Sequence, residues 1–340
     1  MAVNLSIFNS NKYLRFFAQL ILFSIFMILV DHVGGSVLKY FYSKTLYGDN
    51  WPKGNWVTQK KFDVIIFGSS RTFRHYIPSL IEKKIDCTVF NAGENGQYLL
   101  YSYALEQLVL HRYTPRAIVL DLLPSYIIKL DNEQEEFDRL ESLAPYLDEP
   151  EIRSLLIRGK LLNRIKYFSR LYRFNSRILN IADNIRNGPG NFDNGYVSIG
   201  VPKFRPTNKF LIDLMQVPRV DSFKINILKK FISSAREKNV QVIMSFSPTL
   251  EPLSANSKKI LTMYQHLFSS LDVPFIDILS ADHPEFENKA FFMDYIHMNA
   301  RGAEHFSELF SQQLAGVLLR QKTLTAGLEM SDLSIQQDSN

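Results

Sequence analysis

The sequence has almost no cysteine, and it lacks the motifs of several large functional classes. Cys87 is the one cysteine among 340 residues, which excludes an intramolecular disulfide framework and a cysteine-rich metal site. No nucleotide-binding fingerprint or metal-ligand spacing is present, and the net charge of +5 is not gathered into a nucleic-acid-binding motif. We therefore expect no cofactor, no metal and no nucleic-acid partner.

A long apolar run lies near the N-terminus. Residues 16–30 are almost wholly apolar, and extending the run from Leu14 to Val33 gives roughly the twenty residues that cross a hydrocarbon core. We expect an uncleaved membrane anchor over residues 1–34. A cleaved signal peptide is the alternative, but no small-x-small cleavage site follows the run directly.

Charged residues near this run bear on its orientation. Lys12 and Arg15 precede it without an acid, whereas Lys39 and Lys44 follow it. The basic leader favours an N-terminus inside and the rest of the chain exported. The expected location is therefore a single-pass membrane protein whose main domain is extracytoplasmic, on the periplasmic or outer face.

Beyond the anchor, the sequence predicts one α/β domain. Residues 35–60 carry turn signals without periodicity and predict a tether, and residues 61–320 predict the domain. Apolar runs of strand length alternate there with helical patterns, which is typical of a parallel sheet covered on both faces. The predicted strands are residues 64–67, 88–90, 117–122, 240–246 and 275–278, and the predicted helices are residues 78–84, 99–113, 223–238, 260–271 and 302–319. Residues 321–340 are polar and aperiodic and predict a disordered tail.

Residues 131–221 interrupt this alternation and predict a helical and loop insertion after the third strand. The segment begins acidic and becomes basic and aromatic over residues 158–174, where apolar residues recur at helical spacing. This pattern predicts an amphipathic helix. Its basic face is either simply solvated or a contact for a membrane surface, an acidic polymer or a partner protein.

Two separated stretches carry the residues of a possible nucleophilic site. The strand at residues 64–67 ends in Gly68-Ser69-Ser70, so a serine is placed where a strand turns into a helix. More than two hundred residues later the chain reads Asp294-Tyr295-Ile296-His297, which supplies a base and an acid to orient it. Each fragment alone is weak, and their order in an α/β chain strengthens the pair. Asp282-His283 is a second acid–histidine pair, but its Pro284 indicates a surface loop.

The ordered set resembles the SGNH (GDSL-type) hydrolase superfamily over residues 61–125 and 222–320. The resemblance implies a three-layer flavodoxin-like fold with a five-stranded parallel sheet. It also implies that Ser70 is the nucleophile, His297 the base and Asp294 its partner, with the N–H groups of Ser70 and Gly93 binding the oxyanion. Within the superfamily, the anchor, the Gly-Ser-Ser variant and the middle insertion look most like extracytoplasmic acyl-transfer proteins of D-alanylation and exopolysaccharide O-acetylation.

The sequence departs from the family pattern in two places. Ser69 stands where Asp is usual, and the Gly-x-Asn-Asp block that normally follows the third strand is absent after Asp121. One oxyanion donor is thus missing or replaced by Ser125 or a backbone N–H. Arg71 and Asn95 are candidate substrate contacts.

Two functions follow from these features. The first is a membrane-anchored serine esterase or O-acyltransferase that acts on an exported glycan or lipid-linked saccharide through an acyl-serine intermediate. The second is a catalytically inert scaffold that binds polysaccharide or partners a membrane-bound O-acyltransferase through its basic segment. The intact serine and Asp-x-x-His favour the enzyme, whereas the missing Asn favours the scaffold.

Overall fold

The computed structural model describes residues 12–46, 53–129, 132–159, 161–187, 193–207, 218–250, 253–279 and 282–337. The chain divides into two compact units. One comprises Met1–Asn55 and Glu141–Gly190, and the other comprises Trp56–Leu140 and Asn191–Asn340. The larger unit contains the sheet.

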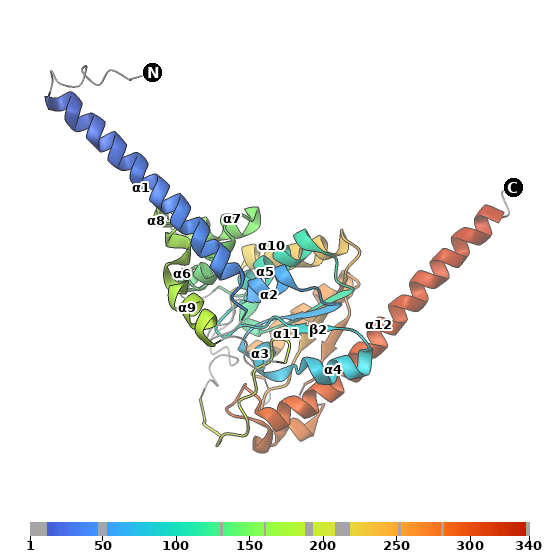
Figure 1. Ribbon diagram of the computed structural model, residues 1–340. Coiled ribbons are helices and arrows are strands. Elements are labelled where there is room, and N and C mark those ends of the chain that lie inside the picture. The colour runs from blue at the N-terminus through green and yellow to red at the C-terminus, as the bar shows by residue number, and fades with distance from the viewer. Residues whose placement is uncertain are drawn as a thin grey trace. The chain divides into compact units, whose positions relative to one another are not determined.

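The sheet has five parallel strands, which confirms the predicted α/β class (Figure 1). The strands are β1 (Val64–Phe67), β2 (Val89–Asn91), β3 (Ala117–Asp121), β4 (Gln241–Phe246) and β5 (Phe275–Asp277). Their spatial order is β2-β1-β3-β4-β5, a doubly wound order in which ligands bind at the carboxyl ends of β1 and β3. The loops after these two strands therefore mark the expected site.

Helices of the larger unit cover both faces of the sheet. They are α3 (Ser70–His75), α4 (Pro78–Ile85), α5 (Leu99–Arg112), α6 (Glu133–Arg139), α10 (Ser222–Arg236), α11 (Ala255–Ser270) and α12 (Ala300–Gln337), with short 3-10 turns η2 (Pro124–Ile127), η6 (Pro284–Glu287) and η7 (Lys289–Phe291). A further helix, α2 (Lys53–Gln59), crosses the boundary between the two units.

Successive side chains of a strand point to opposite faces of the sheet, so their contacts show which helices cover each face. Val64 and Ile66 of β1 belong to a core that includes α4 and the first turns of α12. Phe67 points to the other face, where its ring meets Phe231 of α10 edge-on. Every residue of β1 is buried, as expected for a strand covered on both faces.

The smaller unit is helical over its described residues. It contains α1 (Lys12–Ser43), η3, which begins at Leu140 on the boundary and ends at Tyr146, α7 (Pro150–Gly159), α8 (Leu161–Lys166), η4 (Tyr172–Arg177) and α9 (Ile178–Asn187). Residues 12–30 of α1 expose apolar side chains on all sides, and α1 is long and apolar enough to span a membrane. The Asp31 carboxylate then accepts hydrogen bonds from Ser169 Oγ and the N–H groups of Arg170 and Leu171.

Four predicted segments differ from the structure. The anchor helix does not end near residue 34, because α1 continues to Ser43, and α2 occupies part of the predicted tether. The helix predicted over residues 158–174 is broken into α8, a turn and η4. The predicted irregular tail continues α12 to Gln337. Parts of the predicted tether and of the predicted insertion, and the last three residues, lie outside the described residues.

Candidate active site

The turn after β1 brings Ser70 to the carboxyl edge of the sheet. Gly68 has φ +153°, and a Cβ there would collide with Thr72 Oγ1, so glycine is required. Ser69 is the N-cap of α3, and its side chain accepts from the Arg71 N–H at 3.4 Å. Ser70 is therefore the first residue of α3, with a half-buried side chain.

The loop before α12 holds His297 in a tight turn. The Asp294 Oδ1 atom accepts from the N–H groups of Ile296 and His297, both at 2.9 Å. The Met293 N–H donates to the His297 carbonyl at 2.9 Å, which closes the turn. Asn299 caps α12, because its Oδ1 accepts from the Arg301 N–H at 3.0 Å.

These two loops bring Ser70, His297 and Asp294 into one hydrogen-bonded chain. His297 Nε2 lies 2.7 Å from Ser70 Oγ, and His297 Nδ1 lies 2.8 Å from Asp294 Oδ2. A carboxylate only accepts, so Nδ1 carries the proton and Nε2 is left to accept from the serine hydroxyl. The predicted triad residues therefore have the geometry of a serine nucleophile with an oriented base.

Comparison with known proteins does not place the chain in a family. No protein-family model matches it. A search of curated proteins also finds no match.

Arg71 does not have the predicted position of a substrate contact. Its side chain is fully buried, donates to the Ser247 carbonyl and to Ser247 Oγ, and lies over the Phe246 ring at 4.4 Å. It also reaches the Leu122 carbonyl at 3.5 Å. A guanidinium enclosed in this way cannot meet a substrate, so this prediction is wrong, and Arg71 instead joins the loops after β3 and β4.

Asp121, at the end of β3, is the centre of a buried polar network that the sequence did not reveal. Its carboxylate accepts from Tyr76 Oη and the Ser247 N–H, both at 2.9 Å, and from Thr72 Oγ1 at 3.3 Å. Burial raises the pKa of Asp121, and the positive charge of Arg71 opposes that rise. The one sequence signal was a charged residue that ends a fully apolar strand.

His75 connects this network to the loop that carries His297. The Met298 N–H donates to His75 Nε2 at 3.0 Å, so in the neutral ring Nδ1 carries the proton and donates to Ser247 Oγ at 2.9 Å. Burial and the nearby charge of Arg71 lower the pKa of His75 well below its usual value. His75 is therefore a neutral residue that fixes the backbone next to His297.

Gly93 packs closely under α3, and its amide has a partner. A Cβ at Gly93 would lie too close to the Phe73 nitrogen. The Gly93 N–H donates to Asn91 Oδ1 at 3.0 Å, so binding an oxyanion there would require this bond to be exchanged. Ser125, the suggested substitute donor, is buried in η2. Asn95 is exposed in the same loop as Gly93, and its contact with a substrate stays a prediction.

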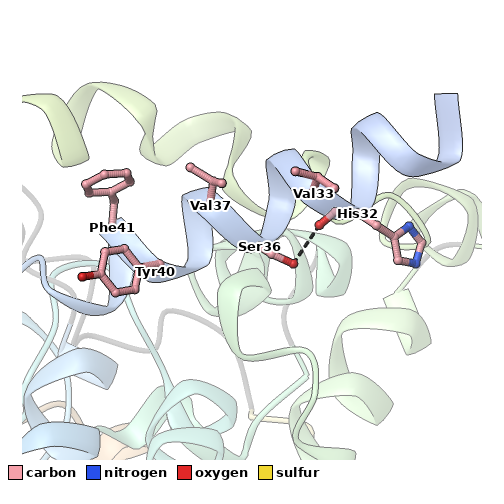
Figure 2. Close-up of a pocket in the computed structure, with 6 residues that line it drawn as sticks. All are labelled: His32, Val33, Ser36, Val37, Tyr40 and Phe41. Carbon is pink, nitrogen blue, oxygen red and sulfur yellow. Dashed lines mark hydrogen bonds between the residues drawn. The ribbon is translucent and has the colours of Figure 1, made fainter. Parts of the chain in front are cut away.

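Within the described residues, no group of three or more His, Cys, Asp and Glu side chains is placed to hold a metal ion. A pocket on α1 is lined only by that helix, and none of the triad residues contributes to it (Figure 2). Its lining residues are His32, Val33, Ser36, Val37, Tyr40 and Phe41. A surface formed by a single helix does not enclose a substrate.

Proposed function

We propose that this chain is a membrane-anchored serine esterase or O-acyltransferase acting on an exported glycan or lipid-linked saccharide. The observation that carries the proposal is the continuous hydrogen-bonded chain from Ser70 Oγ through the imidazole of His297 to Asp294. The family resemblance supplies the substrate class. The apolar helix α1 supports attachment to a membrane. The basic residues Lys12 and Arg15 before the apolar run favour a catalytic domain on the outer side.

The reaction has two steps with an acyl-serine between them. Ser70 Oγ attacks the acyl carbonyl carbon as its proton moves to His297 Nε2, and the bond from that carbon to the donor oxygen breaks. His297 returns the proton to the departing oxygen. A water molecule or a sugar hydroxyl then gives its proton to His297 and attacks the acyl carbon. The bond from that carbon to Ser70 Oγ breaks, and His297 returns the proton to Ser70 Oγ. Asp294 stabilises the imidazolium at both stages.

A fluorophosphonate probe tests the proposed nucleophile. The detergent-solubilised full chain should be labelled, and Ser70→Ala and His297→Ala should each abolish the labelling while thermal unfolding stays cooperative. His283→Ala is a matched control, because His283 pairs with Glu285 away from the triad residues, and it should label normally. Labelling that survives Ser70→Ala would refute the proposal.

The second candidate is the inert scaffold that binds polysaccharide or a membrane-bound O-acyltransferase. The engaged N–H of Gly93 favours it, because a predicted oxyanion donor is already in use. A folded chain that never labels, even with a membrane fraction present, would support this function over the enzyme.

A further inference from the structure

In the segment formed by α8 and the two residues after it, polar side chains point into the protein and apolar side chains point outward. Asn163 and Tyr167 point inward, and Asn163 Nδ2 donates to the Leu156 carbonyl at 3.1 Å. Leu162, Ile165 and Phe168 point outward and are 56%, 70% and 77% exposed. Burying apolar side chains of this size is favourable. Their arrangement therefore indicates that something apolar covers them.

Hydrogen bonds within the smaller unit fix the position of this segment along α1. The residue directly after Phe168 is Ser169, whose hydroxyl donates to Asp31, and the next two backbone N–H groups donate to the same carboxylate at 2.8 and 3.1 Å. The helix α1 comes so close here that a Cβ at Gly35 would collide with Arg170. Phe168 therefore lies at the level of Asp31.

Asp31 is the first charged residue of α1 after Arg15. From Lys12 to Asp31 the helix rises roughly 28 Å, close to the thickness of a hydrocarbon core. Past Asp31 the exposed apolar side chains of α1 lie on one side of the helix (Figure 2). A carboxylate is costly inside the hydrocarbon core, so Asp31 marks the boundary between the acyl chains and the headgroups. Residues near the level of Asp31 would then lie at this boundary.

Basic residues lie among the exposed apolar ones. Arg164 and Arg170 are exposed, and Lys166 is half-buried. Side chains of this kind place their apolar stems against lipid and their charges near lipid phosphates. A bilayer surface therefore fits both the apolar and the charged part of the segment.

We propose that residues 162–170 lie in the headgroup layer of the bilayer that α1 crosses. Leu162, Ile165 and Phe168 enter the boundary with the acyl chains, and Arg164 and Arg170 meet lipid phosphates. This contact holds the smaller unit against the membrane surface. It goes beyond the proposed catalytic function and requires only that α1 is a span.

Single-cysteine labelling of the full chain in vesicles tests the contact. The background is Cys87→Ser, and a fluorophore is attached at Ile165→Cys or Phe168→Cys in vesicles of phosphatidylcholine and phosphatidylglycerol that carry brominated acyl chains. Phe23→Cys, within the apolar part of α1, is the control for insertion, and Ser154→Cys, exposed on α7, is the control for water. Quenching at 165 and 168 should exceed that at 154 by about two-fold or more.

Three results would overturn the proposal. If quenching at residue 168 is no greater than at residue 154 while residue 23 is strongly quenched, α1 spans the membrane but the surface contact is refuted. Weak quenching at residue 23 would show that α1 is not inserted, and would refute both the span and the surface contact. Shielding at 165 and 168 that appears only after other membrane proteins are added would assign the segment to a protein partner instead of lipid.

Discussion

Asp294 contacts both the imidazole and the backbone of its own turn. One oxygen accepts from two N–H groups, and the other faces His297 Nδ1. Asp294→Asn keeps the shape but can offer an NH₂ group to Nδ1, which favours the wrong tautomer. We expect the fluorophosphonate labelling rate to fall by about 10³–10⁴-fold, as measured by gel fluorescence over time.

The matched control for this change is Asp282→Asn. Asp282 is an exposed carboxylate beside a histidine, in the second acid–histidine pair of the sequence. The Asp282→Asn variant should be labelled at the wild-type rate. Equal losses in both variants would show that the effect is not specific to Asp294.

His75 is expected to act as a positioning residue. In His75→Leu the Met298 N–H loses its acceptor and Ser247 Oγ loses a donor, so labelling should slow more than tenfold. His75→Gln keeps an acceptor in the place of Nε2 and should recover part of the rate. Circular dichroism melts of both variants separate loss of positioning from loss of the fold. Equal rates in the Leu and Gln variants would contradict the role.

The triad residues could be predicted from sequence, whereas the residues supporting them could not. Ser70 and His297 belong to short patterns whose order in an α/β chain restricts where they can lie. Arg71 was predicted to meet substrate because arginine beside a nucleophile suggests an anion contact. Its burial depends on Ser247, which is 176 positions away, and no local pattern encodes a contact of that range.

Helices α5 and α10 meet around a buried carboxyl group, which makes the stability of their packing depend on pH. Glu106 is fully buried, where it accepts from Ser234 Oγ and Gln107 Nε2, both at 3.1 Å. Burial raises the pKa of Glu106 well above its usual value, so the folded chain keeps a proton that the unfolded chain loses. Between the usual and the raised pKa, stability therefore falls as pH rises.

Glu106→Gln removes this dependence. Relative to wild type, its free energy of unfolding should rise as pH increases above the usual glutamate pKa of 4.5, by up to about 1.4 kcal/mol per pH unit. Urea unfolding at each pH measures the difference. Glu237→Gln, an exposed position after α10, should show no such trend. A Glu106→Gln difference that is flat across pH would contradict the prediction.

The alternation of strands and helices was predictable, and the ends of several helices were not. The sequence after residue 34 suggested an irregular tether, but in the structure the helix continues, and Gly34 and Gly35 let α1 pass close to Leu171 and Arg170. The amphipathic pattern after residue 158 suggested one helix, but the carboxylate of Asp31 accepts from the backbone of residues 170 and 171 and stabilises a break. Both outcomes depend on contacts between distant segments, which override local propensity.

The length and apolar composition of α1 lead to a testable expectation for attachment of the whole protein to membranes. The full chain should stay in the membrane pellet after extraction at alkaline pH, because a span of this length is not released by breaking electrostatic contacts. N-terminal sequencing of the pelleted protein should find residues that precede Lys12, as expected of an uncleaved anchor. Release into the supernatant would indicate a peripheral protein, and a start beyond Val33 would indicate a cleaved signal.

The wide separation of Ser70 and His297 along the sequence also determines when the site can form during synthesis. The two residues are 227 positions apart, which takes a ribosome roughly 11–45 s to translate at 5–20 residues per second. During that interval the serine of the nascent chain has no base, and a serine without a base is a weak nucleophile. On the proposed function, the emerging polypeptide is therefore unreactive toward esters while its first helix enters the membrane, and reactivity begins only after the segment containing His297 has been made.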